Sequence, residues 1–393
     1  MKILQVIPYF SWSYGGPVRV VYELAHKLAE RDHEVTIYTT DVARGHRIGE
    51  SEKIIVAGDI DIRYFKCLSN YAASRFDLHL SRQMQTAFKR EIGSFDIVHT
   101  HEWRGFHNAC VWHYARKYGI PYVLQAHGAL PKALDQQSNI FVLAKHVSDA
   151  IINTRVLRDA SKAIALTQAE ALAYEELGVE KRNIAIVPNG LDLSQFEKLP
   201  ARGTFREKYG IESNEKIVLF LARIHKTKGL ELLLRAFCGL QNEVADAKLV
   251  IAGPDGGYLA RVSADISRLG ITDNVLLTGP LYGQAKLEAY VDAEAYVLPS
   301  SYDMFPVSPI EACACGVPTI VTNRCGFADA IEGVGCVVDY DADQLLSAMR
   351  LVITSAQLRD KMRIKGPAMV RERYDLEKVV DDLEQLYATC LRR

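Results

Sequence analysis

The chain has 393 residues, of which 49% are hydrophobic and 24% are charged. This length is too great for one ordinary hydrophobic core and predicts two domains. Its 47 basic and 48 acidic side chains give a net charge of −1, which argues against a protein that binds nucleic acid. No apolar run approaches the roughly 18 residues that a spanning helix needs, and the eight cysteines are scattered, so we expect a cytoplasmic protein with reduced thiols.

Short β-branched runs alternate with helix-length segments through the first half of the chain. The expected strands are Ile3–Pro8, Val35–Thr40, Ile97–Thr100, Tyr122–Gln125, Ala163–Leu166 and Ile184–Val187. This alternation is typical of a parallel sheet covered by helices. The apolar part of the first run is too short for a signal peptide, so it is interpreted as a buried strand.

The same alternation restarts after Asn189-Gly190 and a polar stretch that ends at Asn214. The expected strands are Ile217–Leu221, Lys248–Ala252, Val275–Leu277, Tyr296–Leu298, Thr319–Val321 and Cys336–Val338. The fold class is therefore α/β, with two Rossmann-like doubly wound domains at residues 1–190 and 191–373. Ligands of such open sheets bind beyond the carboxyl ends of the strands, so the loops there are where chemistry is expected.

Residues 374–393 form a last segment whose apolar side chains recur at helical spacing. They are Leu376, Val379, Val380, Leu383, Leu386 and Tyr387. This helix needs a surface to cover.

Two carboxylates, Asp303 and Glu311, lie on either side of an expected helix start at Ser308-Pro309. One interpretation is structural: Ser308-x-x-Glu311 is a capping box, with Ser308 as the N-cap. The other is a ligand site, because two acids suit the hydroxyls of a sugar and a helix N-terminus suits a diphosphate. A sugar nucleotide carries both groups.

Three further loops follow expected strands. Arg223 and Lys228 lie between a strand and its helix, where two cations suit a diphosphate, although a solvated basic loop is the commoner fate of such residues. Gly15-Gly16 precedes Pro17 at a helix start, and glycines there permit close approach to the backbone. His127, in Gln125-Ala-His-Gly128, is by itself a weak candidate.

No metal site is expected. His99, His101 and Glu102 lie at one strand end without a further ligand group at metal-site spacing. Asp59-Ile-Asp61 and Asp339-Tyr-Asp341 formally match a metal-binding pair of acids, and both are interpreted as polar turn residues.

Asp303-x7-Glu311 with the following Ala-Cys-Ala-Cys-Gly-Val-Pro318 resembles the E-x7-E signature of the GT4 family of retaining glycosyltransferases, whose fold is GT-B. Arg223-x4-Lys228 resembles that family's Arg-x4-Lys pair. Asp303 departs from the pattern, because the family usually has Glu there. The resemblance implies two domains facing each other across a cleft, with the helix of residues 374–393 returning to the N-terminal, acceptor-binding domain.

The resemblance also assigns the donor site, in the C-terminal domain. It implies a hexosyltransferase-type enzyme whose co-substrate is a nucleotide-diphosphate sugar, with UDP- or GDP-sugar expected, and which needs no other cofactor. Arg223, Lys228 and Gly16 would bind the diphosphate, and Glu311 the ribose. Gly253 and Leu281 would line the pocket of the base.

The remaining assignments concern the reacting sugar and its acceptor. The donor sugar would contact Asp303, Met304, Phe305, Pro306 and His127. Of these, His127 and Asp303, together with Glu311, are the candidate catalytic residues. Gly15 and Gly16 would lie on the acceptor side. The acceptor is expected to be a hydroxyl of a glycan, a lipid-linked molecule or a small molecule, as in polysaccharide biosynthesis.

Three questions stay open on the sequence alone. A GT-B-fold nucleotide-sugar epimerase would use much of the same pocket, and the replacement of Glu by Asp303 also fits a non-catalytic nucleotide-sugar-binding protein. Weak peripheral contact with the cytoplasmic face of a membrane is the third. The cations in question, in a region expected to be helical, are Lys132, Lys145, Arg155, Arg158 and Lys162, although nearby acids favour a solvated face.

Overall fold

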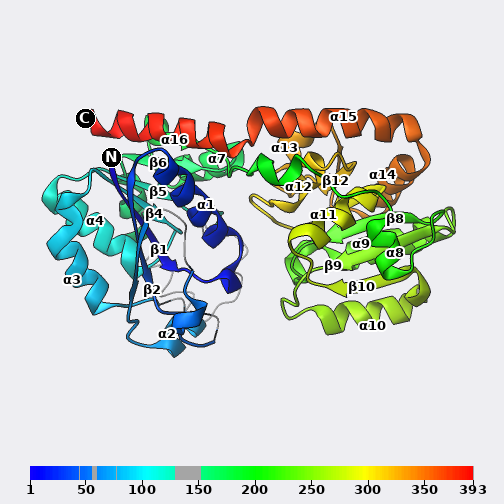
Figure 1. Ribbon diagram of the computed structural model, residues 1–393, viewed down its shortest axis with the longest axis horizontal. Coiled ribbons are helices and arrows are strands. Elements are labelled where there is room, and N and C mark those ends of the chain that lie inside the picture. Colours follow the sequence, from blue (N-terminus) through cyan, green and yellow to red (C-terminus); the bar gives the residue numbers. More distant parts are fainter. Residues whose placement is uncertain (44, 55–59, 77, 129–151, 393) are drawn as a thin grey trace. The chain divides into compact units, whose positions relative to one another are not determined.

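The computed structural model describes residues 1–393 except 44, 55–59, 77, 129–151 and 393 (Figure 1). Residue contacts divide the chain into two compact units. The amino-terminal unit comprises Met1–Gly190 and Glu377–Arg393, and the carboxy-terminal unit comprises Leu191–Leu376. Each unit has its own sheet and its own hydrophobic core.

A parallel sheet of seven strands, in the order β3-β2-β1-β4-β5-β6-β7, forms the centre of the amino-terminal unit. The strands are β1 (Lys2–Tyr9), β2 (Glu34–Thr40), β3 (Ile60–Phe65), β4 (Ile97–His101), β5 (Tyr122–Gln125), β6 (Lys162–Ala165) and β7 (Ile184–Ile186). Ile3, Leu4 and Val6 of β1 are fully buried. Helices cover both faces of a parallel sheet, which explains why its central strands are continuous apolar runs.

The helices of this unit are α1 (Gly16–Glu30), α2 (Asn70–Phe76), α3 (Arg82–Glu91), α4 (Phe106–Tyr118), α6 (Thr154–Arg158), α7 (Gln168–Glu176) and α16 (Leu376–Leu391). Amphipathic α1 shows how they pack. Its Val18, Val21 and Leu28 are fully buried, whereas the charged side chains between them are not. A helix with one apolar stripe covers one face of a sheet.

The edge strand β3 was not predicted, and Asp61 within it was wrongly interpreted as a turn residue. Asp61 is in the strand and pairs with Arg63, whose Nε lies 2.6 Å from the Asp61 Oδ2. An edge strand buries little of its surface, so its alternation of charged and apolar residues gave a weak signal. Asp59 lies outside the described residues.

The carboxy-terminal unit contains a parallel sheet of six strands in the order β10-β9-β8-β11-β12-β13. The strands are β8 (Lys216–Leu221), β9 (Ala247–Ala252), β10 (Val275–Gly279), β11 (Ala295–Leu298), β12 (Thr319–Thr322) and β13 (Cys336–Val338). The helices are α8 (Thr204–Tyr209), α9 (Leu230–Gln241), α10 (Leu259–Leu269), α11 (Gly283–Asp292), α12 (Ser308–Ala314), α13 (Ala328–Ile331), α14 (Ala342–Thr354) and α15 (Ala356–Arg373). The predicted α/β class, with two doubly wound sheets, is confirmed.

Each sheet has one point where the strand order reverses. In the amino-terminal unit it lies between β1 and β4, and in the carboxy-terminal unit between β8 and β11. The loops that leave such neighbouring strands run to opposite sides of the sheet, which opens a crevice at their carboxyl ends. The loops after these four strands are therefore the first place to look for a site.

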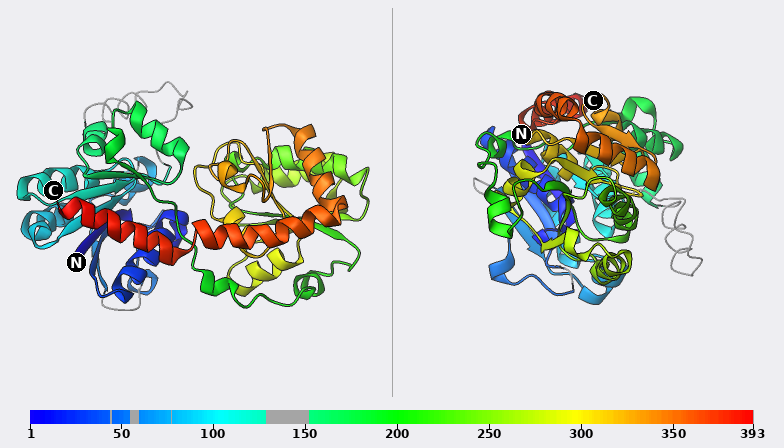
Figure 2. Two further views of the ribbon diagram at one scale, coloured as in Figure 1. Left: turned by 90° about the horizontal axis from the view of Figure 1, so that it is seen from above. Right: turned by 90° about the vertical axis from the view of Figure 1, so that its right-hand side faces the viewer.

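The final helix α16 belongs to the amino-terminal unit, and the left view of Figure 2 shows it in red. Its predicted apolar stripe is buried, with Val380 and Tyr387 fully so. Arg31, which follows α1, makes ion pairs of 2.6–2.7 Å with Glu377, Asp381 and Glu384 of α16. Apolar contact and a charge cluster together attach α16 to this unit.

The proposed basic surface is only partly described. Lys132 and Lys145 lie outside the described residues, and Arg155 and Arg158 are helical, but Lys162 is in β6, so its expected place in a helical region was wrong. Arg158 and Lys162 donate to the carbonyls of Leu177 and Arg182, respectively. In the described part of the chain, no helix combines the length and the apolar character needed to cross a bilayer.

We expect Arg31→Met to loosen α16. The change removes the shared partner of three acids, and because these side chains are partly exposed, solvent screens each pair. The cost should be about 1–2 kcal/mol, which corresponds to about 5–30-fold faster amide hydrogen exchange in α16. The effect should shrink in high salt.

Arg182→Met is the matched control, because Arg182 makes a single pair with Glu180 and both are largely exposed. It should leave exchange in α16 unchanged. Bonds from Lys27 and Arg31 lower the pKa of Glu377, so the ion pairs are present above its unfolded pKa and are lost as the pH falls through the folded value. Equal exchange in wild type and Arg31→Met at neutral pH would contradict the role of the cluster.

Candidate functional site

Lys228 and Asp303 meet at the switch point of the carboxy-terminal unit. Lys228 ends the short helical turn Lys226–Lys228 after β8, and Asp303 lies in the loop after β11. The Lys228 Nζ forms a short ion pair with Asp303 Oδ2, and both side chains are mostly buried. The structure thus brings together two residues predicted from separate motifs.

Close backbone contact holds these two loops together. Gly229 has φ +72°, and a Cβ there would lie 1.8 Å from the carbonyl oxygen of Pro299. Only glycine fits, because any side chain would collide with that backbone. Ser301 adds hydrogen bonds to Thr227 O, 2.9 Å from its backbone nitrogen and 3.2 Å from its Oγ.

Glu311 does not form the capping box that Ser308-x-x-Glu311 suggested. The N-cap of α12 is Val307, Ser308 is already helical, and its Oγ accepts from the Tyr296 hydroxyl at 2.7 Å. The Glu311 carboxylate lies 2.7 Å from Lys286 Nζ and accepts from the Tyr290 hydroxyl at 3.1 Å. The capping interpretation was wrong because these partners come from α11. Glu311 is instead a buried carboxylate held by a cation.

Arg223 lies in the same loop as Lys228 and is exposed. Its aliphatic carbons pass close to Gly256, where a Cβ would lie 3.0 Å from Arg223 Cγ. Gly253 has a structural role of its own, since a Cβ there would lie 1.9 Å from the carbonyl oxygen of Ala222. The loops after β8 and β9 therefore pack backbone against backbone.

The other predicted donor-site residues lie in the loops after β10 and β11 of the same unit. Leu281 has its side chain in the core, so only its backbone is available to a base. A Cβ on Gly326 would lie 1.7 Å from Met304 O, so that segment is held tightly. Phe305 is partly buried with its ring 5.9 Å from that of Tyr374, and Pro306 is buried.

Gly15 and Gly16 follow β1 and begin α1. Gly15 is the N-cap with φ 82°, and Pro17 is in the first turn, as the sequence indicated. A Cβ on Gly16 would meet nothing within 4 Å and no positive φ is recorded there. Packing within the described chain does not explain glycine at this position, whereas close approach of a ligand to the backbone would.

His127 follows β5 and takes part in a stack of imidazole rings. His101 stacks on His99 with centroids 4.1 Å apart and on His127 at 5.1 Å. His101 Nδ1 lies 2.9 Å from His127 Nε2, and His101 Nε2 lies 2.6 Å from Gln5 Oε1. Burial lowers the pKa of His127 to about 3, that of His99 also to about 3, and that of His101 well below its ordinary value. The rings are neutral near pH 7.

Strained backbone marks the same strand ends. Among the described residues other than glycine, positive φ is found at Asp32, Glu102 and His127. Glu102 directly follows β4, and His127 lies two residues after the end of β5. The Tyr9 hydroxyl donates to Glu102 Oε1 at 2.5 Å, and Glu170 accepts from the Gly128 amide at 2.8 Å. Such strain clusters at functional sites.

Sequence reasoning missed several of these groups. His101 and Glu102 were considered only as metal ligands, and Lys286, Gln5 and Glu170 were not considered. β1 and β4 are buried on both faces, so burial alone does not single out Gln5 or His101, and only the order of the strands shows that β1, β4 and β5 are neighbours. Within the described ranges, no group of three or more His, Cys, Asp or Glu side chains could hold a metal ion.

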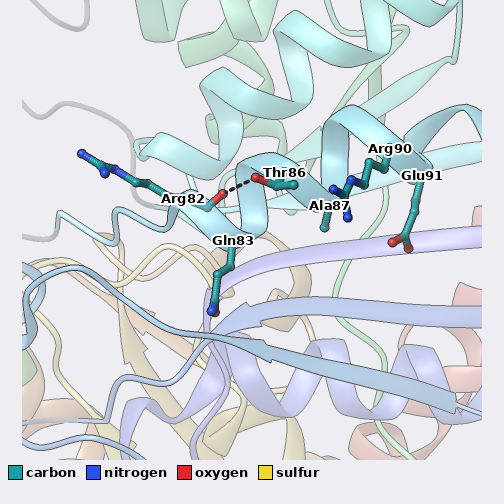
Figure 3. Close-up of a pocket in the computed structure, with 6 residues that line it drawn as sticks. All are labelled: Arg82, Gln83, Thr86, Ala87, Arg90 and Glu91. Carbon is teal, nitrogen blue, oxygen red and sulfur yellow. Dashed lines mark hydrogen bonds between the residues drawn. The ribbon is translucent and has the colours of Figure 1, made fainter.

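A hollow along α3 is a separate feature, shown in Figure 3. It is lined by Arg82, Gln83, Thr86, Ala87, Arg90 and Glu91. All six residues come from one helix, the arginines do not converge in the close-up, and Glu91 already pairs with Arg63. We assign it no ligand.

Family models match both halves of the chain. "Glycosyltransferase Family 4" matches residues 14–195, and "Glycosyl transferases group 1" matches residues 201–369. The chain is 27% identical over 389 residues to N-acetyl-alpha-D-glucosaminyl L-malate synthase of Bacillus anthracis, covering 97% of this chain and 95% of that protein. It is 24% identical over 397 residues to D-inositol 3-phosphate glycosyltransferase of Nocardiopsis dassonvillei, covering 96% and 90%.

Solved structures share the fold. HepE of Anabaena in complex with UDP superimposes with a TM-score of 0.80 at 16% identity, covering 99% of this chain and 100% of that one. Sucrose-phosphate synthase of Thermosynechococcus elongatus gives a TM-score of 0.80 at 20% identity, covering 99% of each chain. The family resemblance inferred from Asp303-x7-Glu311 and Arg223-x4-Lys228 is confirmed: the chain belongs to the group 1, family 4 glycosyltransferases of the GT-B fold.

Proposed function

We propose that this glycosyltransferase moves a sugar from a nucleoside diphosphate to a hydroxyl acceptor with retention of configuration at the anomeric carbon. The observation that carries the proposal is the ion pair of Lys228 with Asp303 beyond the carboxyl ends of β8 and β11. Glu311 lies in α12, the helix that follows the loop of Asp303, so a cation for phosphate and two carboxylates for hydroxyls come from the loops and helix beyond a switch point, where open sheets bind nucleotides.

The donor would be held in three parts. Lys228 and the exposed Arg223 would bind the diphosphate, because both lie in the loop that precedes α9. Glu311 would accept hydrogen bonds from the ribose hydroxyls. Asp303, with the backbone of residues 304–306, would orient the sugar. The backbone near Gly253 and Leu281 would contact the base.

A UDP-sugar is the first donor to test. HepE, which shares the fold over 99% of this chain, has been crystallised with UDP and with UDP-glucose. A GDP-sugar stays the second choice. The relatives named for L-malate and D-inositol 3-phosphate make a small anionic acceptor the first to try, before a glycan or a lipid-linked molecule.

Retention fits a front-face displacement. The bond between the anomeric carbon and the diphosphate oxygen breaks, a bond to the acceptor oxygen forms on the same face, and the acceptor proton passes to the departing phosphate. Lys228 and Arg223 would stabilise the charge that grows on the diphosphate, so they should matter more in the transition state than in the ground state. Gly15 and Gly16 would allow the acceptor and phosphate to approach the backbone.

We expect Lys228→Ala and Arg223→Ala each to lower kcat about 100-fold or more, the effect of removing one donor to a developing anion. Both proteins should stay folded. Lys226→Ala is the matched control, since Lys226 is an exposed cation two residues before Lys228. Steady-state release of free nucleotide measures the effect. Wild-type turnover in both variants would remove the phosphate assignment.

Glu311→Gln should raise the KM for the donor about tenfold or more, because the ribose loses a charged acceptor. It also leaves Lys286 buried without its carboxylate, which destabilises the protein. Glu311→Gln combined with Lys286→Met removes both charges and should restore the melting temperature without restoring the donor KM. Recovery of both would mean that Glu311 has only a structural role.

The configuration of the product tests retention. With a donor of known anomer, proton NMR of the product should show the same anomer. Free nucleotide should accumulate mainly when an acceptor is present. Nucleotide sugar that isomerises without release of the nucleotide would instead indicate an epimerase, and calorimetric binding without any release would indicate a non-catalytic protein.

A further inference from the structure

The buried imidazoles of the amino-terminal unit can each carry only one proton, so each hydrogen bond among them has a direction. Gln5, His99, His101 and Tyr387 are fully buried, and the low pKa of the rings keeps them neutral. In a neutral imidazole one nitrogen donates and the other accepts. Once the donor of one hydrogen bond in such a series of neutral rings is known, the donor and the acceptor of every other bond follow.

Gln5 fixes the first bond. Its amide nitrogen lies on the side of α16, 3.5 Å from the Tyr387 hydroxyl, and that hydroxyl is 2.7 Å from His99 Nδ1. Its amide oxygen therefore faces His101 Nε2 at 2.6 Å. A carbonyl oxygen can only accept, so His101 carries its proton on Nε2.

The second bond follows from the first. With Nε2 protonated, His101 Nδ1 can only accept, and the group 2.9 Å away is His127 Nε2. His127 must then carry its proton on Nε2 and donate it to His101. The other nitrogen, His127 Nδ1, is left with a lone pair.

That nitrogen is buried and has no hydrogen-bond partner among the described residues. An unsatisfied buried acceptor is costly, and where one persists it calls for an explanation. The backbone of the same residue is held at φ 52°, and the next amide, Gly128, is tied to the buried carboxylate of Glu170. Ring and backbone are thus both constrained, with one polar atom left for another molecule.

We propose that Gln5 and His101 are positioning residues that hold His127 in the Nε2-protonated tautomer, so that its Nδ1 accepts a hydrogen bond from a hydroxyl of a bound substrate. The ligand part of this inference rests on the proposed function. The tautomer itself rests only on the contacts within the amino-terminal unit. His127 can then select a hydroxyl, which donates, and disfavours groups that only accept.

The tautomer can be read directly by nitrogen NMR of the full-length protein with isotope-labelled histidine, the His127 signals being identified by their loss in His127→Gln. We expect a proton on Nε2 and none on Nδ1 in wild type. Gln5→Leu should give a mixture of tautomers. Thr40→Val loses a buried hydrogen bond to Pro8 O and a contact with His79 Nδ1 but touches none of the stacked rings, so it should keep the wild-type His127 signals. A proton on Nδ1 in wild type, or an unchanged spectrum in Gln5→Leu, would overturn the inference.

Kinetics test whether Gln5 acts through His127. Gln5→Leu should lower kcat/KM about tenfold, the value of one net hydrogen bond, and should cause no further loss in a His127→Ala background. Additive losses would show that Gln5 matters only for stability and would overturn the positioning role.

Different results would refute the ligand contact and the proposed function. Wild-type kinetics in His127→Ala would refute the contact between Nδ1 and a substrate hydroxyl, even with the expected spectrum. No turnover of any nucleotide sugar by wild type would refute the proposed function, and the wild-type spectrum would still confirm or overturn the tautomer.

Discussion

Contact between the backbone at Gly229 and the carbonyl of Pro299 is the constraint on which the donor half of the site depends. It leaves no room for a Cβ, so the loop after β8 and the loop after β11 must touch. Lys228 and Asp303 then have to pair, because each is mostly buried and a buried charge without a partner is costly. The topology supplies the rest, since β8 and β11 are the neighbours between which the strand order reverses.

The ion pairs Lys228–Asp303 and Lys286–Glu311 have different consequences under the proposed function. Glu311 is held by Lys286 and Tyr290, so its carboxylate is oriented before a ribose arrives. Asp303 instead pairs with Lys228, the cation that is assigned to the diphosphate. A diphosphate that approaches Lys228 meets the charge of Asp303 as well, and exposed Arg223 would offset that repulsion. Asp303 is one methylene shorter than the usual Glu, which suits a direct bond to Lys228 but shortens its reach toward a sugar.

The sequence predicted the strands of both sheets except the edge strand β3. The β-branched runs of β1 and β11 reflect burial on both faces, whereas β3 alternates charged and apolar residues at an edge. Local motifs were less reliable than topology. Ser308-x-x-Glu311 satisfies the pattern of a capping box, yet the partners of Glu311 lie 21 and 25 residues away in sequence. The identity of those partners could not be read from the motif, because α11 approaches α12 only in the folded unit.

The chemistry of His127 likewise could not be predicted from its local sequence. Its motif could be found in the sequence, but its chemistry depends on Gln5 and His101, which are 122 and 26 residues away and come from neighbouring strands. A lone His at that position could carry a proton on either nitrogen or on both. A charged ring would favour an anionic group, whereas a neutral ring with one free lone pair favours a hydroxyl. The buried stack therefore keeps the ring uncharged by desolvation and directs its single proton toward His101, which leaves Nδ1 as the acceptor for a substrate hydroxyl under the proposal.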